Sequence, residues 1–181
     1  RVRMLRARWA ALRGDLESQR AQLQDVLSTA PEFSGLVAQP LLDCHAALGR
    51  APEGLSLLRD QYARLPTLDL FNVIFRALRL TEGAVPAWAF ARQALRAHPS
   101  LLGLDRLLEV ELGQGAENLP DEPLVPGADL GLLRSMIHKH TQRLDRYACG
   151  QCGFEARRYY WQCPGCNAWE TYRPRRLEEI R

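Results

Sequence analysis

The chain has 181 residues, of which 46% are hydrophobic, 25% charged and 8% aromatic, and its formal net charge is +3. This composition is typical of a folded globular protein and excludes a disordered, collagen-like or disulfide-dense chain. So small a net charge also excludes a chain that binds nucleic acid through its overall charge. No run of about 18 apolar residues occurs, so the sequence predicts no membrane-spanning helix.

Residues 1 to about 113 are predicted to be helical almost throughout. Apolar side chains recur three and four positions apart, which is the spacing of one face of an α-helix. The runs are Leu5, Trp9, Leu12 and Leu16; Leu23, Val26 and Leu27; Leu55, Leu58 and Tyr62; and Leu70, Ile74, Phe75 and Leu78. No strand alternation interrupts these segments.

A repeat with a period near 34 residues organises this helical part. It is marked by three glycines and three prolines at matching intervals: Gly14, Gly49 and Gly83, and Pro31, Pro66 and Pro99. Each glycine suits a tight turn after a first helix, and each proline closes a second helix because it lacks an N–H. This pattern is typical of tetratricopeptide (TPR) repeats, which form a solenoid with a concave, partner-binding surface. A non-repeating helical bundle remains the alternative.

One proline and three small residues add detail to the predicted helices of the repeat. Pro40 lies inside the first helix of the second unit, so this helix is expected to start late or to kink there. Gly54, Ala87 and Ala91 fall where paired helices must approach closely.

The chain after the repeats changes character twice. We predict a helix at 100–112, a Gly- and Pro-rich linker at 113–127 and an amphipathic helix at 128–143. The domain boundary is placed near Asp145. TPR-like repeats and the following helices then occupy 1–144, and a metal-binding module occupies 145–181.

Four of the five cysteines form two Cys-x-x-Cys motifs, Cys149–Cys152 and Cys163–Cys166, with ten residues between them. Each motif points two sulfurs at one metal ion, and four sulfurs make a closed tetrahedral site for zinc or a single iron. Gly153 and Asn167 follow the motifs, where a left-handed backbone is often required. We expect the module to pack against the repeats, because its aromatic side chains need cover.

Other uses of these cysteines are less well supported. A single Cys-x-x-Cys would suit thiol–disulfide chemistry, and covalent haem would need a histidine directly after the motif. Because protein fills all four positions, none is open for catalysis, and we expect no enzyme. An electron carrier remains an alternative, as does a zinc-ribbon nucleic-acid binder that uses the arginines at 157–158 and 173–176.

The remaining cysteine and the four histidines are given ordinary roles. Cys44 is predicted to be a buried small apolar side chain. His138 and His140 lie two apart on a predicted helix, so they make a poor metal pair. Surface positions are expected for all the histidines, which are His45, His98, His138 and His140.

Residues 147–174, YACGQCGFEARRYYWQCPGCNAWETYRP, resemble the rubredoxin-like C-terminal module of the lipopolysaccharide assembly protein B (LapB, also called YciM) family. The segment His98-Pro99-Ser100 and the TPR array are also similar to that family, so the resemblance covers the whole chain, loosely before Leu80. Family members carry an N-terminal transmembrane helix and further TPR units. We therefore expect this chain to be the C-terminal portion of such a protein.

The resemblance implies a non-enzymatic adaptor on the cytoplasmic face of the bacterial inner membrane. Members restrain lipopolysaccharide synthesis by promoting degradation of the LpxC deacetylase by the membrane protease FtsH, under an inner-membrane lipopolysaccharide sensor. The implied partners are these proteins and no nucleic acid, with membrane contact only through an N-terminal helix absent from this chain. Cys149, Cys152, Cys163 and Cys166 match the family's ligands for one iron or zinc ion.

Overall fold

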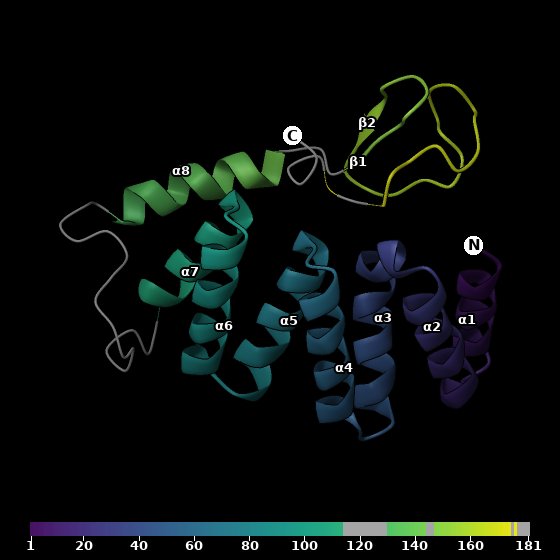
Figure 1. Ribbon diagram of the computed structural model, residues 1–181, viewed down its shortest axis with the longest axis horizontal. Coiled ribbons are helices and arrows are strands. Elements are labelled where there is room, and N and C mark those ends of the chain that lie inside the picture. The colour runs from purple at the N-terminus through teal and green to yellow at the C-terminus, as the bar shows by residue number, and fades with distance from the viewer. Residues whose placement is uncertain (114–129, 144–146, 175, 177–181) are drawn as a thin grey trace.

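The computed structural model describes residues 1–113, 130–143, 147–174 and 176 (Figure 1). Its helices are α1 (Val2–Leu12), α2 (Leu16–Thr29), the short 3-10 helix η1 (Pro31–Phe33), α3 (Ser34–Ala47), α4 (Ala51–Arg64), α5 (Leu68–Thr81), α6 (Ala84–Ala97), α7 (Leu101–Glu111) and α8 (Leu130–Arg143). Two short strands, β1 (Tyr147–Ala148) and β2 (Glu155–Ala156), belong to the C-terminal module, by which we mean the described residues from Tyr147 onward. The predicted fold class, mostly helical with a small four-cysteine module, is confirmed.

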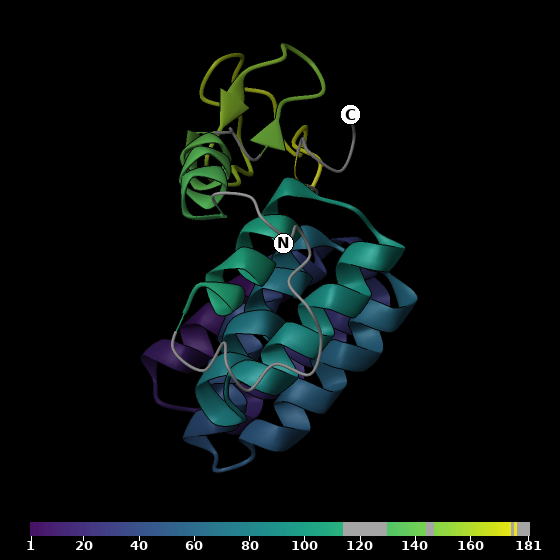
Figure 2. The same ribbon diagram turned by 90° about the vertical axis from the view of Figure 1, so that its left-hand side faces the viewer.

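Successive helices from α1 to α7 pack against one another as stacked hairpins, and α5 also contacts both α3 and α7. Helix α8 and the C-terminal module lie together beyond the same ends of these helices (Figures 1 and 2). Three repeated glycines make the turns within successive helical hairpins. Gly14, Gly49 and Gly83 have φ angles of 71°, 72° and 97°. These angles lie in the left-handed region that residues with a Cβ atom rarely adopt.

The repeated prolines stand just after the second helix of each hairpin. Pro31 follows α2, Pro66 follows α4 and Pro99 follows α6. The predicted TPR-like array is therefore confirmed, and the alternative of a non-repeating bundle is not supported.

Pro40 lies in the interior of α3, which begins six residues before it at Ser34. The expected late start of this helix is wrong. A proline in a helix leaves one carbonyl, here that of Leu36, without its usual amide donor. Burial offsets this cost, because Val37, Ala38 and Leu41 are each 0% exposed.

The core of the array is centred on α5. Five of its apolar side chains are at most 2% exposed: Leu70, Phe71, Ile74, Phe75 and Leu78. Small residues let the neighbouring helices approach, as predicted: a Cβ atom at Gly54 would lie 2.8 Å from that of His45. Two large apolar residues of α1 behave differently, since Trp9 and Leu12 are 62% and 81% exposed.

Cys44 and His45 are neighbours on α3, and both are buried. Cys44 is 2% exposed, as predicted, and its thiol donates to the Leu16 carbonyl at 3.1 Å. The expected surface position of His45 is wrong, because this side chain is 3% exposed beside Gly54. Neither ring nitrogen of His45 has a hydrogen-bond partner among the described residues. Burial lowers the pKa of His45.

The two predicted helices around the linker are present. Ser100 caps α7 by accepting a hydrogen bond from the Gly103 amide. Helix α8 packs against α7, where Nδ1 of His138 lies 3.1 Å from a carboxylate oxygen of the buried Asp105. Residues 114–127 of the predicted linker and the boundary at Asp145 lie outside the described residues, so these remain predictions. No described helix is long and apolar enough to cross a membrane.

Candidate metal centre

The C-terminal module is built from two tight turns, which short antiparallel backbone pairings hold together. Tyr147 pairs with Ala156 between β1 and β2, and Cys149 forms an isolated bridge with Tyr172. Gly153 and Asn167 have φ angles of 75° and 60°, so the predicted left-handed backbone after each Cys-x-x-Cys motif is confirmed. The turns thus bring residues 149–152 and 163–166 face to face.

The four cysteine sulfurs of Cys149, Cys152, Cys163 and Cys166 all lie within 4.8 Å of one another. Across the two motifs, the sulfurs of Cys149 and Cys166 are 3.8 Å apart, and those of Cys152 and Cys163 are 3.6 Å apart. A tetrahedral ion with sulfur ligands at about 2.3 Å requires sulfur–sulfur distances of about 3.8 Å. The donor set therefore fits one zinc or iron ion, as the sequence predicted.

Backbone and side-chain donors surround these sulfurs. The amide of Gln151 points at the Cys149 sulfur and that of Gly165 at the Cys163 sulfur, each at 3.4 Å. The hydroxyl of Thr171 lies 3.1 Å from the Cys149 sulfur. Such donors favour thiolates over thiols.

The ionisation of the four cysteine thiols also favours binding of a cation. The Thr171 hydroxyl, more than any other group, lowers the pKa of Cys149 to about 6. At Cys152, which is exposed, the Phe154 amide favours the thiolate, but desolvation by the surrounding cluster and the three neighbouring cysteines outweigh it and raise the pKa to about 12. Four thiolates at these distances repel one another, so a bound cation rather than protons lets all four ionise.

Comparison with known proteins agrees with this geometry. Residues 147–174 match the family model described as a rubredoxin metal binding domain. Over 96% of its length the chain is similar, at 26% identity, to proteins named lipopolysaccharide assembly protein B from Escherichia coli K12 and from Haemophilus influenzae. The resemblance to this family is confirmed. The chain spans 43% and 42% of the length of these two relatives.

The C-terminal module is docked on the helical array, as predicted. The Tyr147 hydroxyl donates to Oδ2 of Asp69 at 3.0 Å. The guanidinium of Arg176 binds Oδ1 of the same carboxylate at 2.6 and 2.7 Å. Asp69 stands in the first turn of α5. It therefore receives donors from both ends of the module's described residues.

Aromatic stacking completes this junction. Phe33 at the end of η1 stacks on Trp161 with ring centroids 5.7 Å apart, and Tyr159 meets Phe33 edge-on at 6.2 Å. Leu36 of α3 packs against the buried residues of the module. The sequence offered no signal for Phe33 or Asp69, because an apolar residue before a helix and an acid in its first turn are ordinary at those places.

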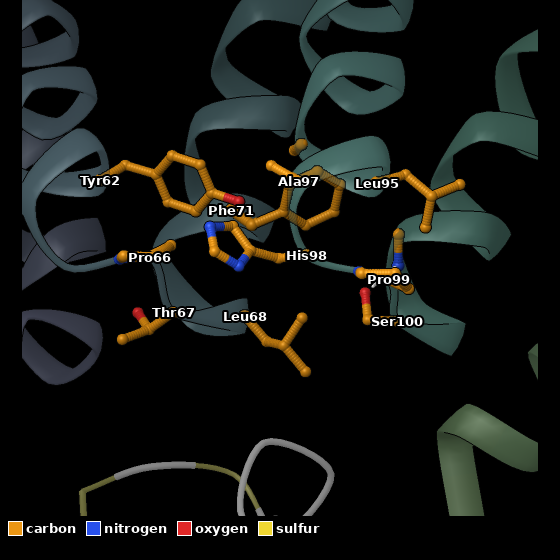
Figure 3. Close-up of a pocket in the computed structure, with 12 residues that line it drawn as sticks. Tyr62, Pro66, Thr67, Leu68, Phe71, Leu95, Ala97, His98, Pro99 and Ser100 are labelled. Atoms are coloured by element: carbon orange, nitrogen blue, oxygen red, sulfur yellow. Dashed lines mark hydrogen bonds between the residues drawn. The ribbon is translucent and has the colours of Figure 1, made fainter.

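A separate pocket of about 350 Å³ opens where α4, α5, α6 and α7 converge (Figure 3). Its walls are mainly apolar or aromatic, and they include Tyr62, Phe71 and Leu95. His98 and Ser100 add polar groups, but the Ser100 hydroxyl is engaged in capping α7.

Proposed function

We propose that Cys149, Cys152, Cys163 and Cys166 bind one metal ion, zinc or iron, as a structural centre. The sulfur–sulfur distances of 3.6 and 3.8 Å support this assignment. A bound ion would neutralise the thiolates and close the turns around a module that has few buried apolar residues. Protein groups would fill all four positions of a tetrahedral ion, which favours a structural role over catalysis.

We further propose that the chain serves in lipopolysaccharide assembly, the role after which its relatives are named. It would act there as a non-enzymatic adaptor, with protein partners at the cytoplasmic face of the inner membrane. More specifically, we propose that the chain promotes degradation of LpxC by FtsH and responds to an inner-membrane lipopolysaccharide sensor, as the family resemblance implies.

The observation that carries the adaptor proposal is the junction at Asp69. An electron carrier needs no helical array. Here the Asp69 carboxylate of the array binds two donors of the module, and aromatic rings from both parts stack on one another. Docking of this kind produces one continuous surface from two parts, and a TPR solenoid is a surface for binding proteins. The metal would then hold the module's part of that surface in shape.

A rubredoxin-like electron carrier is the second candidate, and one feature favours it. Cys152 is exposed while Cys149 and Cys163 are buried, so one edge of the cluster is open to an electron-transfer partner. This candidate requires iron and a reversible one-electron couple.

The adaptor proposal is tested by titrating the zinc-loaded chain with LpxC and, separately, with the cytoplasmic part of FtsH. The comparison uses the variant Cys149→Ser/Cys163→Ser, with Cys44→Ala as the matched control because Cys44 lies outside the cluster. We expect the native chain and Cys44→Ala to bind at least one partner and the double variant to lose binding. Absence of binding by the zinc-loaded native chain contradicts the adaptor proposal, and a reversible couple in the iron form then favours the electron carrier.

A further inference from the structure

The Thr171 hydroxyl has a fixed place beside the candidate metal centre. The Gly150 amide donates to the Thr171 carbonyl at 2.7 Å, and the next residue, Tyr172, forms the bridge with Cys149. These backbone contacts hold the Thr171 side chain against the first Cys-x-x-Cys motif. Its Oγ1 lies 3.1 Å from Sγ of Cys149, a side chain that is 3% exposed.

The hydroxyl of the next residue, Tyr172, provides a contrast. It lies 3.9 Å from the Cys163 sulfur, but it also lies 3.2 Å from the Phe154 carbonyl, to which it donates. A hydroxyl has one proton, so the Tyr172 proton is engaged by that carbonyl. The Thr171 hydroxyl is therefore the closer of the two to sulfur, and the Tyr172 proton is directed at a carbonyl instead.

We propose that Thr171 is a positioning residue of the metal centre, whose O–H donates to the Cys149 thiolate and strengthens metal retention. The inference rests on the proposed ligation by the four cysteines. Four thiolates on a divalent ion carry a net charge of about −2, and charge-assisted hydrogen bonds to sulfur spread that charge. The backbone amides of Gln151 and Gly165 serve the two motifs alike, whereas the Thr171 hydroxyl is a side-chain donor on the Cys149 side.

The first test measures zinc retention by the full chain against a chromogenic chelator. Loss of an outer hydrogen bond to a metal ligand typically weakens affinity by about 10- to 100-fold, so Thr171→Val should lose at least about tenfold. Thr171→Ser keeps the hydroxyl and should restore retention to within about twofold of the native chain. Tyr172→Phe should also retain zinc to within about twofold of the native chain, because the Tyr172 hydroxyl donates to the Phe154 carbonyl.

The second test is a readout that packing alone would not change. In the iron-loaded chain, hydrogen bonds to sulfur favour the reduced ion, so Thr171→Val should shift the reduction potential to more negative values. Thr171→Ser and Tyr172→Phe should leave it near the native value. The inference is overturned if Thr171→Val keeps both native retention and native potential, or if Thr171→Ser fails to rescue. A native chain that binds no stoichiometric metal would instead overturn the proposed metal site itself.

Discussion

The helical array and the C-terminal module differ in how their stability is distributed. In the array the core runs through several helices, with Leu41, Leu58, Ile74 and Leu107 all 0% exposed. In the module the buried cluster consists of Tyr147, Cys149, Ala156, Cys163 and Tyr172, and two of these are cysteines of the candidate centre. We infer that many apolar contacts hold the array, whereas the metal centre and the junction at Asp69 hold the module.

The largest effect expected from this difference is the response to losing the metal. Cys163→Ser replaces a fully buried cysteine of the candidate centre, so we expect the module to lose its metal and its ordered backbone. The array should keep its helices, because its core lies outside the cluster. Limited proteolysis should cut the variant within residues 147–174, while far-ultraviolet circular dichroism stays near native. A simultaneous collapse of helical signal would show that the array depends on the metal.

The converse experiment disrupts the core of the array. Phe75 is 1% exposed in the middle of α5, so Phe75→Ala should cost about 3–5 kcal/mol of unfolding free energy. Chemical denaturation followed by circular dichroism measures this loss, and zinc content after mild unfolding reports on the module. We expect zinc to be retained when the helices melt. Loss of zinc together with the helices would mean that the two regions unfold as one unit.

The junction can be weakened while both regions stay folded. Asp69→Asn removes the charge that receives Arg176 and Tyr147, which should cost about 1–3 kcal/mol of docking free energy. NMR relaxation should then show the zinc-loaded module tumbling faster than the array. Asp60→Asn is a suitable control, because Asp60 is an exposed acid on α4. Unchanged relaxation in Asp69→Asn would show that aromatic stacking at Phe33 is sufficient for docking.

The smallest predicted effect concerns the buried His45. Burial lowers its pKa in the folded chain, so below its ordinary value of about 6.5 the unfolded state binds more protons. Stability should therefore fall as the pH drops below that value. His45→Leu should flatten this part of the curve when the free energy of unfolding is measured between pH 7 and pH 5. An equally steep curve in the variant would assign the pH dependence to another group.

Sequence reasoning succeeded wherever a residue type has few other uses. Glycine at a left-handed turn and cysteine in a paired Cys-x-x-Cys motif are examples, and both Gly49 and the four-sulfur cluster lie where they were predicted. It failed where a position depends on a partner distant in the chain. Asp69 meets Arg176 across more than a hundred residues, and nothing in its local sequence distinguishes it from an ordinary helix-start acid.

Two further predictions, for His45 and for α3, were wrong for the same cause. Burial of His45 depends on Gly54, which lets α4 approach closely enough to cover the ring. The persistence of α3 through Pro40 depends on how deeply the rest of that helix is buried. Local preference predicted the opposite in both cases, because the compensating contacts come from tertiary packing.

The most direct test of the central claim is X-ray absorption spectroscopy at the zinc edge on the metal-loaded chain, with the metal content measured on the same sample. The account predicts one zinc per chain with four sulfur ligands at about 2.3 Å. A first coordination shell that contains nitrogen or oxygen, or a content well below one ion per chain, would contradict it.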